Sequence, residues 1–153
     1  MKHLPALGAA VAFIAAGSAY AATSVNIPLS GTLDKECNID AILDGPFNNL
    51  QMDTTANQQA EQLVANCNYS GTATVTISSA SGGFLVGPTN VGYTLTVQGL
   101  LPATQLVAPA VIGMWPVPVA NVDAPRNLRI NLIAPATVAG LYTDVLTGQI
   151  MFN

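Results

Sequence analysis

Short segments in which every second residue is apolar recur along this chain, and their spacing narrows the possible folds more than any other feature. Three clear examples are "TATVTIS", "VGYTLTVQG" and "NLRINLI". Alternation with a period of two places the apolar side chains on one face of a β-strand. Turn-forming stretches such as "NYSG" and "SSASGG" separate the segments, and we find no long amphipathic helical pattern. The sequence therefore predicts an all-β protein of antiparallel strands, typical of a sandwich.

The stretch "ATSVNIPLSGTLDKEC", residues 22–37, shows the same alternation near the start of the chain. Two interpretations are open: an ordinary first strand of the protein's own sandwich, or a strand that is given to another molecule. Pro28 lies inside it and removes one backbone N–H from any ladder, which leaves the register of such a strand open. Its apolar or small positions are Val25, Ile27, Leu29, Gly31 and Leu33.

Residues 1–21 have the pattern of a signal peptide. Lys2 and His3 precede the apolar run "LGAAVAFIAA", and Ala19 and Ala21 provide the small residues that signal peptidase recognises. We expect cleavage after Ala21 and export of the remaining chain. The apolar run is shorter than the roughly 20 residues that a membrane span needs, and no later stretch is long enough.

Composition argues against several classes of function. Only 8% of the residues are charged, and acidic residues outnumber basic ones by eight to four, so clustered positive charge for nucleic acid is missing. The single histidine, His3, lies in the expected signal peptide, which removes the usual base for serine or cysteine catalysis and the commonest metal ligand. We therefore expect no enzyme, no cofactor and no metal site.

Four carboxylates lie close together in sequence around the first cysteine. Nothing in the sequence fixes them in the geometry of a catalytic pair, and they lack the Asp/Asn-Gly spacing of a calcium loop. A solvated acidic edge is the simpler interpretation. The four are Asp34, Glu36, Asp40 and Asp44.

The two cysteines, Cys37 and Cys67, form an even set in a chain that we expect to be exported. An oxidising compartment favours one disulfide between them over two unpaired buried thiols.

The region 102–135 holds six of the ten prolines but is too apolar for a linker. In "MWPVPV" the two prolines stand two residues apart, so both missing N–H groups point toward the same side of a strand. Two interpretations are open: a protected sheet edge, or an irregular buried crossover.

Together these segments resemble the pilins of the archaic chaperone-usher pathway and the related spore coat protein U domain. The resemblance rests on the two cysteines, with Cys67 in "QLVANCNY", on "VTISSASGG" followed by "VGYTLTVQG", and on the ending "AGLYTDVLTGQIMF". It covers most of the chain after residue 21.

The resemblance implies an incomplete immunoglobulin-like β-sandwich, residues 34–153, that lacks its last strand and is completed by a donor strand from another subunit. Residues 22–33 would be the donor, with Val25, Ile27, Leu29, Gly31 and Leu33 facing the groove. The implied partners are identical or related pilin subunits, a periplasmic chaperone and an outer-membrane usher, and the implied location is an extracellular pilus that supports attachment or biofilm formation. The groove would be bordered by Tyr142, Leu146, Gly148, Ile150 and Phe152.

Other functions remain open on the sequence alone. The chain has the size of a secreted single-domain adhesin or glycan-binding module, in which Trp115 or Tyr93 would stack on a sugar, although lone aromatic residues of a sandwich usually belong to the core. A structural protein of a spore coat is a third interpretation. Asn68 begins an Asn-Tyr-Ser glycosylation sequence, which matters only in a host that modifies such sites.

Overall fold

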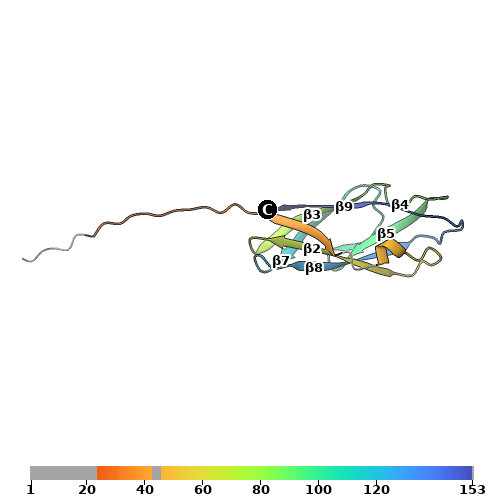
Figure 1. Ribbon diagram of the computed structural model, residues 1–153, viewed down its shortest axis with the longest axis horizontal. Coiled ribbons are helices and arrows are strands. Elements are labelled where there is room, and N and C mark those ends of the chain that lie inside the picture. The colour runs from red at the N-terminus through yellow and green to blue at the C-terminus, as the bar shows by residue number, and fades with distance from the viewer. Residues whose placement is uncertain (1–23, 43–45, 153) are drawn as a thin grey trace, which may run out of the picture. The chain divides into compact units, whose positions relative to one another are not determined.

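The computed structural model describes residues 24–42 and 46–152 (Figure 1). Contacts divide the chain into two units, Met1–Thr32 and Leu33–Asn153. In the first unit, the described residues 24–32 form no helix or strand, and their side chains are exposed. The expected signal peptide, residues 1–21, lies outside the described residues. Within the described ranges no helix has the length and apolar character needed to cross a membrane.

The second unit is built from two antiparallel sheets, which confirms the predicted all-β class (Figure 1). The larger sheet has the order β1-β2-β8-β5-β4, and β6 also pairs with β5; the smaller sheet has the order β7-β3-β9. One short 3₁₀ helix, η1 (Pro46–Asn49), follows β1. The strands are β1 (Cys37–Ile42), β2 (Gln58–Cys67), β3 (Gly71–Ser79), β4 (Phe84–Leu85), β5 (Val91–Val97), β6 (Leu101–Thr104), β7 (Ala110–Val117), β8 (Ala124–Leu132) and β9 (Leu146–Phe152).

The core lies between the two sheets and contains the alternate residues of their facing strands. Along β5 and β3 every second side chain is buried, as the period-two pattern predicts. Trp115 is fully buried and its indole nitrogen donates a 3.1 Å hydrogen bond to the carbonyl oxygen of Ala124. Tyr93 is also buried. Both aromatic residues therefore belong to the core and are unavailable for stacking on a sugar.

The strand order is consistent with an immunoglobulin-like sandwich. In a seven-strand domain of that kind, strands A, B, E and D form one sheet and strands C, F and G the other. Here β1, β2, β8 and β5 have the positions of A, B, E and D, and β3 and β9 those of C and F. The Tyr142 hydroxyl donates a 2.7 Å hydrogen bond to the carbonyl of Val138, four residues upstream, which resembles the tyrosine corner of such folds. No described strand takes the position of G, beside β9.

β7 is an edge strand, which decides between the two interpretations of "MWPVPV". It pairs with β3 alone, and the register shifts between Ala73 and Val75 of β3. Opposite this shift, Met114 has a positive φ of 63°. A proline such as Pro116 is tolerated on an edge strand because its missing N–H can point away from the neighbour. The bulge and the proline together make this edge a poor template for further pairing.

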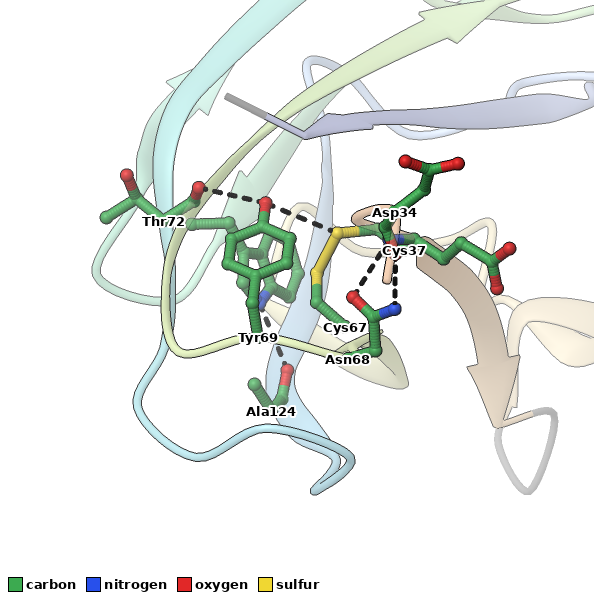
Figure 2. Close-up of a disulfide and its surroundings, with 9 residues drawn as sticks. Asp34, Cys37, Cys67, Asn68, Tyr69, Thr72 and Ala124 are labelled. Atoms are coloured by element: carbon green, nitrogen blue, oxygen red, sulfur yellow. Dashed lines mark hydrogen bonds between the residues drawn. A yellow bond between two sulfur atoms is a disulfide. The ribbon is translucent and has the colours of Figure 1, made fainter. Parts of the chain in front are cut away.

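A disulfide and a set of hydrogen bonds hold the start of β1 to the end of β2 (Figure 2). Cys37 and Cys67 lie opposite each other in the register and are bonded, as predicted from the cysteine count. The Asn68 side chain accepts a bond from the Glu36 amide at 2.9 Å and donates one to the Asp34 carbonyl at 2.8 Å. The Lys35 ammonium lies 4.8 Å from the centre of the Tyr69 ring. Asn68 is therefore occupied in holding residues 34–36.

Replacing both Cys37 and Cys67 by alanine is expected to lower the free energy of unfolding by roughly 3 to 4 kcal/mol, because the crosslink restricts a loop of about 30 residues in the unfolded chain. Urea denaturation of the oxidised protein and of the double variant measures this difference. A loss below about 1 kcal/mol would show that the hydrogen bonds of Asn68 hold this region without the disulfide.

Candidate functional site

An open groove of about 770 Å³ runs along the second unit beside β9. Its floor consists of apolar residues of both sheets, among them Leu63 of β2, Ile77 of β3 and Leu95 of β5. β9 and β1 are the end strands of their two sheets, and the groove includes residues from both. We call it the β9 groove; it is lined by Ile39, Asp40, Ala41, Phe47, Asn49, Leu50, Met52, Glu61, Leu63, Ile77, Leu85, Tyr93, Leu95, Leu128, Ile130, residues 140–146 and Gly148.

The outer edge of β9 has no partner strand among the described residues. β9 pairs with β3 over Ala73–Ser79 without a register shift, and β3 is its only partner among the described strands. An unpaired edge presents a row of backbone N–H and C=O groups that can bond to an added strand. The β9 groove thus combines an open apolar floor with a free strand edge.

The residues expected at the border of the groove lie in different positions. Tyr142, Leu146 and Gly148 line the β9 groove. Ile150 is partly buried against the core, on the same face of β9. Phe152, at the end of β9, is 55% exposed and does not line the groove. Tyr142 precedes β9 rather than forming part of it.

Gly148 leaves space at the centre of this face. A Cβ atom at this position would lie 3.4 Å from the Ile39 side chain and 3.9 Å from that of Leu63. Any larger side chain at residue 148 would therefore extend into the β9 groove.

The residues expected to form a donor strand are exposed in this chain. Val25, Ile27, Leu29 and Leu33 have exposed fractions of 81%, 75%, 92% and 85%. A Cβ atom added to Gly31 would have no neighbour within 4 Å. The described residues 24–36 belong to no strand.

Close backbone approach holds the segment before β9 at one end of the groove. Thr143 and Val86 exchange two backbone hydrogen bonds, at 2.9 and 3.0 Å. A Cβ atom on Gly140 would collide with the ring of Pro88, and one on Gly87 would lie 2.6 Å from the Leu141 carbonyl oxygen. Only glycine fits at these two positions without a shift of the backbone.

Asp144 joins this segment to both sheets, a role that the sequence analysis did not assign. Its carboxylate accepts hydrogen bonds from the Ser79 hydroxyl at 2.6 Å, from the Tyr93 hydroxyl and from the Ser81 amide at 3.0 Å. The Ser79 hydroxyl oxygen also accepts a 2.7 Å bond from the Gly83 amide. Ser79 lies in "SSASGG" and Asp144 in "YTD". No local pattern links these two stretches, and only the fold brings them together.

These contacts shift the pKa values of the Asp144 carboxyl and the Tyr93 phenol. Burial acts to raise the pKa of Asp144, but the hydrogen bonds from Ser79, Tyr93 and the backbone outweigh it and hold the pKa below its ordinary value of 3.8. Burial, followed by the bond to Asp144, raises the pKa of the Tyr93 phenol above its ordinary value. At neutral pH the pair is a phenol that donates to a carboxylate.

Asp144→Asn is expected to lower the free energy of unfolding by about 1 to 3 kcal/mol at neutral pH, because three donors lose a charged acceptor. The pKa of Asp144 is lowered in the folded state, so its contribution is present above pH 3.8 and is lost as the pH falls through the folded pKa. The free energy of unfolding, measured by urea denaturation between pH 2 and 7, should therefore fall less with decreasing pH in the variant than in the parent. The same dependence of the free energy of unfolding on pH in both proteins would contradict this role of Asp144.

The ionisable residues of the β9 groove are all acidic. Asp40, Glu61 and Asp144 line it, and its lining contains no lysine or arginine. Asp34 and Glu36 lie outside its lining, and Asp44 lies outside the described residues. No group of three or more described His, Cys, Asp or Glu residues is placed to hold a metal ion.

A scan against protein-family models and a search of curated proteins found no match to this chain. The β9 groove and the segment before β1 are therefore the features from which a function can be inferred.

Proposed function

We propose that this protein is a structural subunit of an extracellular fibre, assembled by donor-strand exchange in a chaperone-usher pathway. In this proposal the β9 groove of one copy binds residues 22–33 of the next. Repetition of that contact builds a polymer in which every sandwich is completed by its neighbour. The protein carries out no chemistry of its own, and the fibre serves attachment to surfaces or biofilm formation.

The observation that supports this proposal most strongly is a match of two open features in one chain. The β9 groove has an apolar floor and an unpaired strand edge at the position of strand G. Residues 24–33 expose apolar side chains at every second position and pair with no strand of their own chain. The two features are complementary. A strand added beside β9 would form a ladder of backbone hydrogen bonds and at the same time bury its apolar side chains in the groove.

The dimensions of the two features agree. A strand advances about 3.3 Å per residue, so the seven residues of β9 span roughly 23 Å. Residues 24–33, fully extended, span roughly 33 Å. The segment is therefore long enough to cover the free edge of β9 and to leave a short connection to its own sandwich.

The proposal carries expectations about partners and location. A chaperone in the periplasm would cover the β9 groove before assembly, because an exposed apolar groove with an unpaired strand edge promotes aggregation. An outer-membrane usher would catalyse the exchange, and the polymer would leave the cell surface. The disulfide between Cys37 and Cys67 is in keeping with an oxidising compartment.

Deletion of residues 22–33 tests the proposal. The parent and the deletion variant would be expressed with the chaperone and usher, and polymers would be detected by electron microscopy and as ladders on unboiled gels. We expect fibres and ladders from the parent, and none from a deletion variant that is exported and folded. Polymerisation of the deletion variant would overturn the assignment of the donor.

A further inference from the structure

We propose that Pro28 is accommodated in the donated segment because the residues whose side chains enter the β9 groove also form the backbone ladder, in an antiparallel arrangement in which β9 does not use the N–H of residue 28. This inference rests on the proposed function and assigns a role to a residue that otherwise conflicts with it. The occupant of the groove is residues 22–33 of a second copy of this chain.

The backbone hydrogen bonds of β9 alternate between its two edges, and one contact shows which residues face which edge. The Ala80 amide donates a 2.9 Å hydrogen bond to the Val145 carbonyl, one step beyond the pairing of Ser79 with Leu146. Ser79 and Leu146 are therefore opposite each other without bonds between them. The regular register extends this alternation along β9, so residues 146, 148, 150 and 152 turn their N–H and C=O groups to the free edge.

Three of these residues, Leu146, Gly148 and Ile150, also face the core. Leu146 and Ile150 pack against core residues, and a Cβ atom on Gly148 would point at Ile39 and Leu63. On β9 an inward side chain and a free backbone edge thus belong to the same residue. Because one set of residues has both properties, only some pairings of an added strand with β9 are possible.

In an antiparallel ladder, residues that exchange both hydrogen bonds lie directly opposite each other and have their side chains on the same face. A donor residue opposite Gly148 must therefore have an inward side chain and turn its own N–H toward β9. On residues 24–33 this describes the odd-numbered positions, such as Ile27 and Leu29. The even-numbered positions, including Pro28, turn away from β9.

Pro28 thus lies at a position whose N–H would not face β9 in the antiparallel arrangement. In a parallel ladder each residue bonds to the two residues that flank its opposite partner. The outward residues of the donor would then have to supply the N–H groups, and Pro28 would leave a gap in the middle of the ladder. One proline therefore permits the antiparallel arrangement and disfavours the parallel one.

Charge favours this segment as the occupant. The lining of the β9 groove contains Asp40, Glu61 and Asp144 and no basic residue. Residues 22–33 carry no charged side chain, and the first acidic residue of the chain follows directly at Asp34. Asp34 and Glu36 are held by Asn68 in the second unit, which ends the segment that can be donated at Leu33.

The test moves the proline along the full-length chain. Pro28→Ala, Pro28→Ala with Ser30→Pro, and Pro28→Ala with Leu29→Pro would be expressed with the chaperone and usher. Polymer per exported subunit would be measured on unboiled gels. Pro28→Ala with Leu29→Ala is the matched control, since it loses the leucine side chain but keeps the N–H of residue 29.

We expect the first two variants to polymerise within about twofold of the parent, because their outward N–H groups are not used. The variant with Leu29→Pro should form at least about tenfold less polymer than its alanine control, as expected for a lost ladder bond that leaves an acceptor unpaired. Equal polymer from the Leu29→Pro variant and its control, or loss of polymer with Ser30→Pro, would overturn the role of Pro28. Absence of polymer from the parent itself would instead count against the proposed function.

Discussion

Replacement of Ile27 by aspartate is expected to abolish polymerisation of the full-length protein. In the proposed assembly Ile27 enters the β9 groove, where burial of an ionised carboxylate without a partner costs several kcal/mol. The acidic residues that already line this groove add repulsion. A penalty of this size corresponds to a loss of affinity of more than about a hundredfold. The measurement is the ladder of polymers on unboiled gels together with fibres seen by electron microscopy.

Asn26→Asp is the matched control for this change. It introduces the same charge one residue earlier, on the side of the segment that faces solvent in the proposed arrangement. Polymerisation should persist in this variant, and binding of the chaperone should persist in both, because the chaperone fills the groove with its own strand. Loss of chaperone binding in the Ile27→Asp variant would place Ile27 in the subunit's own core and contradict the donor assignment.

Replacement of Gly148 by leucine is expected to block the β9 groove from the acceptor side. A Cβ atom at this position would already lie 3.4 Å from Ile39, and the remaining side-chain atoms would occupy space meant for the donor. The variant should fold, as judged by its circular dichroism and its disulfide, and should fail to accept a strand. We expect a loss of polymer of about fivefold to a hundredfold, in line with the cost of a clash in a packed interior of about 1 to 3 kcal/mol.

Gln149→Leu adds an apolar side chain of similar size to the opposite face of β9. Because that face points away from the groove, its polymer yield should match that of the parent. If Gly148→Leu also polymerises normally, the donor does not cross β9 at residue 148 and the β9 groove is not the binding site.

Much of the sandwich could be predicted from the sequence because alternation in a half-buried strand is a local property. It located the cores of β3, β5 and β8, and the cysteine count predicted the disulfide. The two prolines in "MWPVPV" left a protected sheet edge and a buried crossover both open, and the pairing of β7 with β3 supports the edge. Trp115 and Tyr93 lie in the core, as lone aromatic residues of a sandwich usually do.

The site depended on contacts between distant parts of the chain, which no local pattern reveals. Asp144 was not assigned because its partners Ser79 and Tyr93 are 65 and 51 residues away in sequence. The floor of the β9 groove comes largely from β2, β5 and β8, whereas the predicted border lay only in the final segment, residues 142–152. Tyr142 continues the alternation of β9 but precedes that strand, since Thr143 bonds to Val86 instead of β3.

A mixing experiment tests the central claim most directly, because it separates the donor of one copy from the groove of another. The Ile27→Asp variant keeps an intact groove, and the Gly148→Leu variant keeps an intact donor segment. Neither should polymerise alone. When both are produced together with the chaperone and usher, we expect a 1:1 dimer that survives on an unboiled gel and extends no further. Absence of that dimer, or dimers formed by either variant alone, would contradict the exchange of a strand between residues 22–33 and the β9 groove.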